Sequence, residues 1–203
     1  MIPVFEGNFV EGKWLVPDDR VTTPYSDYEI GPIDLDDPSQ GLLVQQWTMT
    51  VTETVPNVEW TVQIVGENGN SHVIATLDEA PLQVSFTFDQ RAAYTLAWQN
   101  SAGVYLDWYD SSIQSRTIDL ISADIRSPRV TLDDKRFLTS GDSDVLLFYI
   151  SNDQICFRVQ RERFGVERII PDVLVGATDI LLRIGMTNKY RIQIEYGIPC
   201  FTL

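Results

Sequence analysis

The sequence predicts an all-β fold made of an N-terminal arm plus an antiparallel β-sandwich, followed by a smaller β-rich module. Two observations support this prediction. Short apolar alternations, rich in β-branched and aromatic residues, are interrupted by turn-forming residues about every eight to twelve positions, as in sandwich strands. No good amphipathic helix of about ten residues occurs before Leu120. We place the arm at residues 1–40, the sandwich at 41–120 and the second module at 121–203.

Residues 1–40 combine turn-forming residues with aromatic side chains. Proline fixes the backbone torsion and removes an amide donor, so this proline-rich stretch is expected to be extended and irregular. Its aromatic content is too high for a disordered tail, the residues being Phe5, Phe9, Trp14, Tyr25 and Tyr28. We therefore expect an arm that packs along its own domain or along a neighbour's.

Alternation between two faces begins at Leu42 and continues to Leu120. In EWTVQIVG the apolar Trp60, Val62 and Ile64 share one face, and the following ENGN supplies an Asn-Gly turn. HVIATL, LQVSFTF, AAYTLAW and VYLDWY continue the same pattern. About six strands within about 80 residues fit an antiparallel sandwich.

The chain after Leu120 is also predicted to form strands. DVLLFYIS and QICFRVQR flank Asn152-Asp153, a dipeptide that tolerates the positive φ of a tight hairpin. Alternate positions of a strand share a face, so Arg158 lies opposite Phe157 and on the exposed side. A second hairpin is predicted where DILLRIG and YRIQIEY bracket MTNK.

The charge is distributed unevenly along the chain. The formal net charge is −14, and residues 1–120 hold 18 acidic and four basic residues, whereas residues 121–203 hold 11 of each. An acidic surface does not bind DNA or anionic lipid, so no nucleic-acid or membrane partner is expected. The asymmetry allows two interpretations: copies attract each other head to tail, or the acidic segment is a solvated surface.

Few residues are available for catalysis or metal binding. His72 is the one histidine, and Cys156 and Cys200 are the two cysteines, which excludes multi-histidine zinc sites and a dense disulfide framework. Aspartate pairs such as Asp107 and Asp110 are expected by chance in so acidic a chain, and the acidic segments lack the spacing of a calcium loop. We predict no catalytic residue, no metal and no cofactor, and hence no enzyme.

The start of the chain and its hydropathy bear on where it is made. MIPVFEGNFVEGKW lacks the basic and apolar regions of a secretory signal, and no apolar run reaches about 18 residues. We expect synthesis in a cytoplasm.

Two residue sets are candidates for contacts with partners. Bases interleaved with acids after position 120 favour bidentate pairs at a packed junction, both within the chain and between subunits; these are Arg126, Arg129, Asp133, Asp134, Lys135, Arg136, Arg158, Arg161, Arg163 and Glu167. Four aromatic residues flank a predicted hairpin at residues 99–103. They suit either core packing and subunit contact or a carbohydrate platform, and they are Trp98, Tyr105, Trp108 and Tyr109.

The order of segments resembles virion structural proteins of tailed, particularly short-tailed, bacteriophages. SDYEIGPIDLDDPSQGL, FDQRAAYTLAWQNSAGVYLDWYDSS, SPRVTLDDKRF, SDVLLFYI, QICFRVQRERFGVE and IGMTNKYRIQIEY carry the resemblance, which spans about residues 4–196. Its most recognisable parts are residues 106–110, 127–136 and 158–167. None of these phrases has an assigned chemistry, so no catalytic residue is carried over.

The resemblance implies a non-enzymatic structural subunit of a phage tail. Such a subunit would assemble with copies of itself, in a symmetric ring or another multimer, and with other tail proteins. It would be made in the bacterial host cytoplasm and work in the virion tail. The alternative is a receptor- or polysaccharide-binding module at the tail, for which a glycan would be the ligand.

Overall fold

The computed structural model describes residues 6–7, 28–32, 44–89, 91–133, 143–170, 179–185 and 191–197. In this part of the chain the regular elements are strands and one short 3₁₀ helix, so the predicted all-β class is confirmed. The arm at residues 1–40 is described only at 6–7 and 28–32, and its remaining residues lie outside the description.

The described strands form four sheets. Sheet 1 has the order β2-β3-β4-β5 (Tyr28–Pro32, Val44–Val55, Glu59–Gly66 and Ser71–Leu77). Sheet 2 has the order β6-β7-β8-β9 (Gln83–Phe88, Tyr94–Asn100, Gly103–Asp110 and Ser115–Ser122). Sheet 3 has the order β10-β11-β12-β13 (Ile125–Asp133, Asp144–Ser151, Gln154–Val159 and Arg168–Ile169). Sheet 4 has the order β1-β15-β14 (Glu6–Gly7, Arg191–Gly197 and Asp179–Gly185), and β1 runs parallel to β15.

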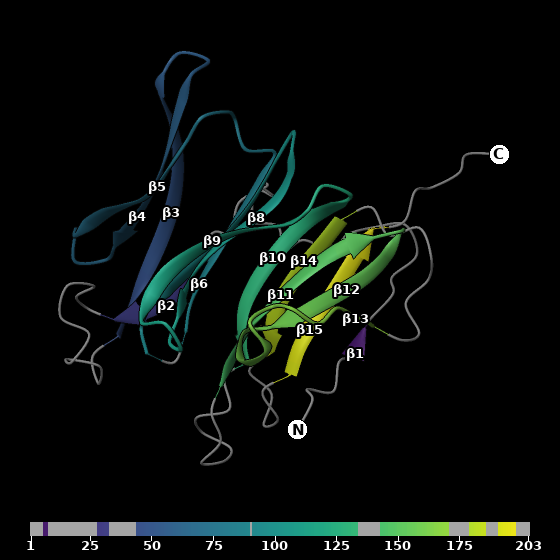
Figure 1. Cartoon of the computed structure of the whole chain (residues 1–203). Coiled ribbons are helices and arrows are strands. Elements are labelled where there is room, and N and C mark those ends of the chain that lie inside the picture. Colours follow the sequence, from purple (N-terminus) through teal and green to yellow (C-terminus); the bar gives the residue numbers. More distant parts are fainter. Residues whose placement is uncertain are drawn as a thin grey trace.

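The sheets pack face to face in chain order, and Figure 1 shows the succession from blue through teal and green to yellow. Three hydrophobic clusters fill the spaces between them. Core 1 joins sheets 1 and 2, with Trp47 and Phe86 fully buried. Core 2 joins sheets 2 and 3, and core 3 joins sheets 3 and 4. Sheets 2 and 3 therefore each lie between two other sheets.

Strand β11 shows how a doubly covered strand is encoded. Every residue from Asp144 to Ile150 is buried. Leu147 and Tyr149 belong to core 2, whereas Leu146 and Phe148, on the opposite face, belong to core 3. Because both faces are apolar, the strand is a continuous hydrophobic run instead of an alternating one.

Core 2 contains residues from both sides of position 120. Leu106 and Trp108 come from β8, and Val145 and Leu147 come from β11. Core 2 therefore spans position 120, and the division of the chain there stays a prediction.

The predicted hairpins are present. Asn152 and Asp153 have φ of 48° and 59° and connect β11 to β12, whose pairing closes at Ser151 opposite Gln154. Gly69 has φ of 86° in the turn between β4 and β5. Strands β14 and β15 pair antiparallel, although the MTNK segment between them lies outside the described residues.

The β7–β8 hairpin contains a glycine that the fold requires. Gly103 has φ of 140°, and a Cβ there would lie 2.5 Å from the Ser122 carbonyl oxygen and 2.8 Å from the Ala123 Cα. We expect Gly103→Ala to destabilise the protein by about 2–5 kcal/mol, because backbone strain and a backbone clash add together. Urea unfolding measures this difference.

Gly69→Ala is the matched control for Gly103→Ala. Gly69 also has a positive φ, but a Cβ there meets nothing within 4 Å. This variant should lose only about 1 kcal/mol, from backbone strain alone. Equal losses at the two positions would contradict the close packing of Gly103 against the end of β9.

Candidate functional site

The connection between β12 and β13 contains several of the charged residues predicted to make contacts in the second half of the chain. We call residues 160–167 the clasp loop. It begins with the 3₁₀ helix η2 (Gln160–Glu162), and Arg163 and Phe164 that follow both have left-handed backbone, with φ of 53° and 52°. These two left-handed residues turn the chain so that Phe164, 1% exposed, inserts into core 2. Its ring meets Trp108 of sheet 2 edge-on, with centroids 5.2 Å apart.

A partly buried hydrogen-bond network fixes the base of the clasp loop. Arg158 donates from Nε to the Tyr149 hydroxyl at 2.7 Å and from a terminal nitrogen to the Phe164 carbonyl at 3.0 Å. Tyr149 in turn donates to the Glu167 carboxylate at 2.6 Å. Burial and the bond to Glu167 raise the pKa of the Tyr149 phenol, so it stays protonated and keeps its donor role.

The arginines of the clasp loop reach aspartates at strand ends. Arg163 forms an ion pair with Asp110, at the end of β8 in sheet 2, at 2.8 Å. Arg161 is paired with Asp144 at the start of β11 in sheet 3. The loop thus ties sheet 2 to sheet 3 by an apolar anchor, Phe164, and by one ion pair, Arg163–Asp110, whereas Arg161–Asp144 lies within sheet 3.

The other predicted contact residues have separate places. Arg126 pairs with Asp153 at 2.6 Å, and both side chains are exposed. Arg129 is buried and donates to the Pro128 carbonyl at 3.0 Å. Asp133 ends β10 opposite Asp144, and its side chain is outside the description.

Asp134, Lys135 and Arg136 lie outside the described residues. The contacts found for the other charged residues of this set are within the chain. Contacts of the same residues with another subunit stay a prediction.

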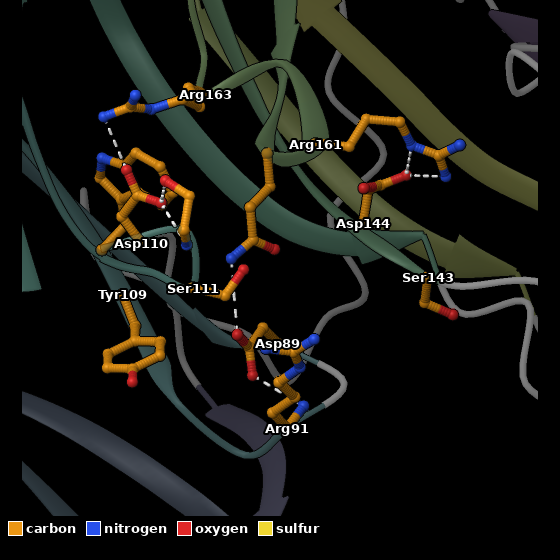
Figure 2. A pocket seen from close by; sticks show the side chains of 12 residues that line it. Asp89, Arg91, Tyr109, Asp110, Ser111, Ser143, Asp144, Arg161 and Arg163 are labelled. Carbon is orange, nitrogen blue, oxygen red and sulfur yellow. Dashed lines mark hydrogen bonds and ion pairs between the residues drawn. The ribbon is translucent and has the colours of Figure 1, made fainter. Parts of the chain in front are cut away.

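A pocket of about 370 Å³ opens at the junction of sheets 2 and 3, beside the clasp loop. Its walls are the β6–β7 loop, the end of β8 and the following turn, the start of β11, and the clasp loop. Three buried aspartates and three exposed arginines line it, so the formal charges balance; they are Asp89, Asp110, Asp144, Arg91, Arg161 and Arg163. Figure 2 shows Arg161 and Arg163 turned apart, each toward its own aspartate.

The pocket aspartates are held by structural bonds. Asp89 accepts the backbone N–H of Arg91 at 2.8 Å and of Ala93 at 2.9 Å, and its second oxygen faces the Gln160 amide at 3.4 Å. Asp110 accepts the backbone N–H of Ser112 at 2.9 Å and its hydroxyl at 2.6 Å.

The hydrogen bond from the Ser112 hydroxyl, the bond from its backbone N–H and the charge of Arg163 lower the pKa of Asp110. Asp110 is therefore ionised at neutral pH and cannot serve there as a proton donor. Its bonds with Ser112 stabilise the turn after β8, and its ion pair with Arg163 attaches the clasp loop to sheet 2.

The four candidate aromatic residues are divided between core and surface. Trp98 is 8% exposed within core 1 and stacks on the half-buried Tyr105, with centroids 5.3 Å apart. Trp108 is 2% exposed within core 2, and its indole N–H donates to Asp119 at 2.9 Å. Tyr109 is half-buried at the pocket wall. Core packing accounts for both tryptophans, which offer no open ring face to a sugar.

Strand β9 is a feature that the sequence analysis did not single out. It is the last strand of sheet 2 and pairs with β8 alone among the described strands. Ile118 and Leu120 on this strand are 65% and 53% exposed. The alternation of isoleucine and leucine with polar residues in SRTIDLIS could have predicted a strand with one apolar face. The sequence does not show that sheet 1 leaves this apolar face uncovered, because that depends on how the sheets pack.

The described side chains include no group of three or more His, Cys, Asp or Glu residues placed to hold a metal ion. Likewise, the described part of the chain has no helix long and apolar enough to cross a membrane. No family model matches the chain, and neither a curated protein nor a solved structure matches it significantly.

The pKa of Asp110 predicts a pH-dependent loss in the Asp110→Asn variant. The pKa of Asp110 in the folded state lies below its ordinary value of about 4. Above about pH 4 the ionised carboxylate therefore makes its full contribution to the stability of the fold. This contribution disappears as the pH falls through the lowered pKa. Urea unfolding should show the variant less stable than the wild type at pH 7 and 5, with the gap closing toward pH 2.

Asp107→Asn is a control with the opposite sign. Asp107 pairs with Arg116 at 2.8 Å, yet burial outweighs this pair and raises the pKa of Asp107. Protonation of Asp107 therefore favours the folded state, and the stability of the wild type relative to this variant should rise as the pH falls. The same pH trend in both variants would contradict the assignment.

Proposed function

We propose that this chain is a non-enzymatic structural subunit of the tail of a tailed bacteriophage. It assembles with copies of itself and with other tail proteins, and it reaches the virion after synthesis in the host cytoplasm. The resemblance of its segments to virion structural proteins is the origin of this proposal.

The structural observation that supports assembly is the exposure of apolar side chains on strands at the edges of the sheets. On one side of the stack β2 contacts β6, β6 contacts β10, and β10 contacts β14. At the opposite edges of sheets 1, 2 and 3 lie β5, β9 and β13. Each of these three strands exposes apolar side chains, namely Val73 on β5, Ile118 and Leu120 on β9, and Ile169 on β13.

Exposed apolar residues on strands that have no second strand partner among the described residues favour contact with other protein chains. Soluble monomers commonly protect such edges with charge, proline or a covering segment, since an open edge is a template for another strand. A stack of four sheets also gives a rigid body, because cores 1 to 3 fix each sheet to the next. Rigidity and open edges together suit a building block of a larger assembly.

The alternative function, a receptor- or polysaccharide-binding module, receives less support. It required exposed aromatic faces, and both Trp98 and Trp108 are buried. The junction pocket offers polar side chains to a glycan, but its aspartates are already bonded to arginines, serine or backbone. We therefore favour the structural role.

Purified virions of the phage that encodes this chain provide the direct test. We expect mass spectrometry of gradient-purified particles to detect the protein in several copies per particle, and a cryo-EM map to place it in the tail. Particles grown without a functional copy of the gene should have incomplete tails. Complete, infectious particles that lack the protein would overturn the proposal.

A further inference from the structure

The open edge of β9 has two properties that bear on its partner. Its outward backbone groups have no strand partner within the described residues, since β8 occupies the other side. Ile118 lies opposite Asp107 and Leu120 lies opposite Tyr105, so the two exposed side chains share one face of sheet 2. Sheet 1 packs on that face over β6 and β7 and leaves both side chains accessible.

The charged residues of β9 are already engaged inside the chain. Arg116 pairs with Asp107, donates to the Tyr94 carbonyl at 3.1 Å and lies over the Tyr94 ring, 3.5 Å from its centroid. Asp119 accepts the Trp108 indole N–H. The remaining side chains of the strand are serine, threonine, isoleucine and leucine. On the face that carries Ile118 and Leu120 the edge therefore presents no unpaired charge, whereas the charged Asp119 carboxylate lies on the opposite face with Trp108.

A strand face without unpaired charge matters in a protein of this composition. Residues 1–120 carry the whole net charge of −14, so two copies repel each other over most of this segment. On the face of β9 that carries Ile118 and Leu120, the one charged side chain is Arg116, which is already paired with Asp107, so two copies can approach there with little repulsion. The strand also lacks the lysine or proline residues that keep edge strands apart.

We propose that β9 pairs antiparallel with β9 of a second copy about a twofold axis. Sheet 2 then continues from one copy into the next through backbone hydrogen bonds. Ile118 and Leu120 of both copies pack on one face of the seam, as cross-strand pairs do within a sheet. With a twofold axis the same strand of each copy forms both sides of the interface, so no second complementary surface is required. This inference rests on the proposed function, since it names one contact by which the subunit assembles.

Sedimentation equilibrium of the full chain tests the contact without any substitution. A monomer–dimer equilibrium is expected, and it should become tighter when NaCl is raised from 50 to 500 mM, because salt screens the repulsion between acidic copies. A head-to-tail contact of acidic and basic segments would instead weaken in salt. That result, or a monomer at every concentration, would overturn the β9 pairing.

Hydrogen–deuterium exchange locates the contact in the wild-type protein. Residues 115–122 should exchange more slowly at concentrations where the dimer forms than at those where the monomer prevails. Protection confined to β5 or β13 would refute the assignment to β9. Protection of β9 only after another tail protein is added would show a different occupant and would equally refute self-pairing.

Ile118→Lys and Leu120→Lys test the apolar contact. Each places two ammonium groups in the seam of the dimer, so we expect the dissociation constant to rise about a hundredfold. Val58→Lys is the matched control, because Val58 is 59% exposed in the β3–β4 turn and should leave the dimer unchanged. Circular dichroism confirms that each variant is folded; folded Ile118→Lys protein that dimerises normally would overturn the proposal.

Failure of this pairing is distinguishable from failure of the proposed function. If the chain is found in virion tails and incorporation of the Ile118→Lys variant is unchanged, the tail role stands and the β9 contact falls. If the chain is absent from virions but dimerises through β9, the reverse conclusion follows.

Discussion

Sheets 2 and 3 each lie between two other sheets, and this constraint determines which charged side chains need a partner within the chain. A charged side chain that is buried on such a strand is removed from water, so it requires a hydrogen bond or an ion pair, as Asp107 forms with Arg116. Asp110 closes β8 and Asp144 opens β11, and their arginine partners come from the clasp loop. These two ion pairs therefore lie at strand ends, beside the apolar core between sheets 2 and 3.

The clasp loop resolves the electrostatic problem that these strand ends create. A buried carboxylate without a partner is strongly unfavourable, whereas one that accepts hydrogen bonds and faces a guanidinium is not. Arg161 and Arg163 supply the guanidinium groups, and Phe164 between sheets 2 and 3 holds both arginines in reach of their partners. The left-handed backbone at Arg163 and Phe164 is the local strain that this arrangement accepts.

Local features of the fold could be predicted from the sequence, because they depend on neighbouring residues. Asn152-Asp153 and the glycine at position 69 mark turns that the structure contains, and the alternation along EWTVQIVG matches β4. The register of the hairpin at Asn152-Asp153 also implies that Tyr149 and Arg158 are diagonal neighbours on one face, a signal that could have identified their hydrogen bond. All of these depend on a few consecutive residues.

The order of the sheets and the partner of each charged residue in an ion pair depend on residues far apart in the sequence. Nothing in the letters around Phe164 indicates that this ring meets Trp108 of another sheet. Trp98 could equally have been a surface ring, and its burial follows only from the position of sheet 1. For the same reason the exposure of β9 follows only from the position of sheet 1, which leaves part of sheet 2 uncovered.

The Cys156 thiol lies in the same core as Phe164. It is 2% exposed, and burial raises its pKa to about 11. Since a thiol reacts as thiolate and only where reagent can reach it, alkylation at Cys156 reports the moments when sheets 2 and 3 separate. The native sequence therefore carries its own chemical probe for the opening of its central layer.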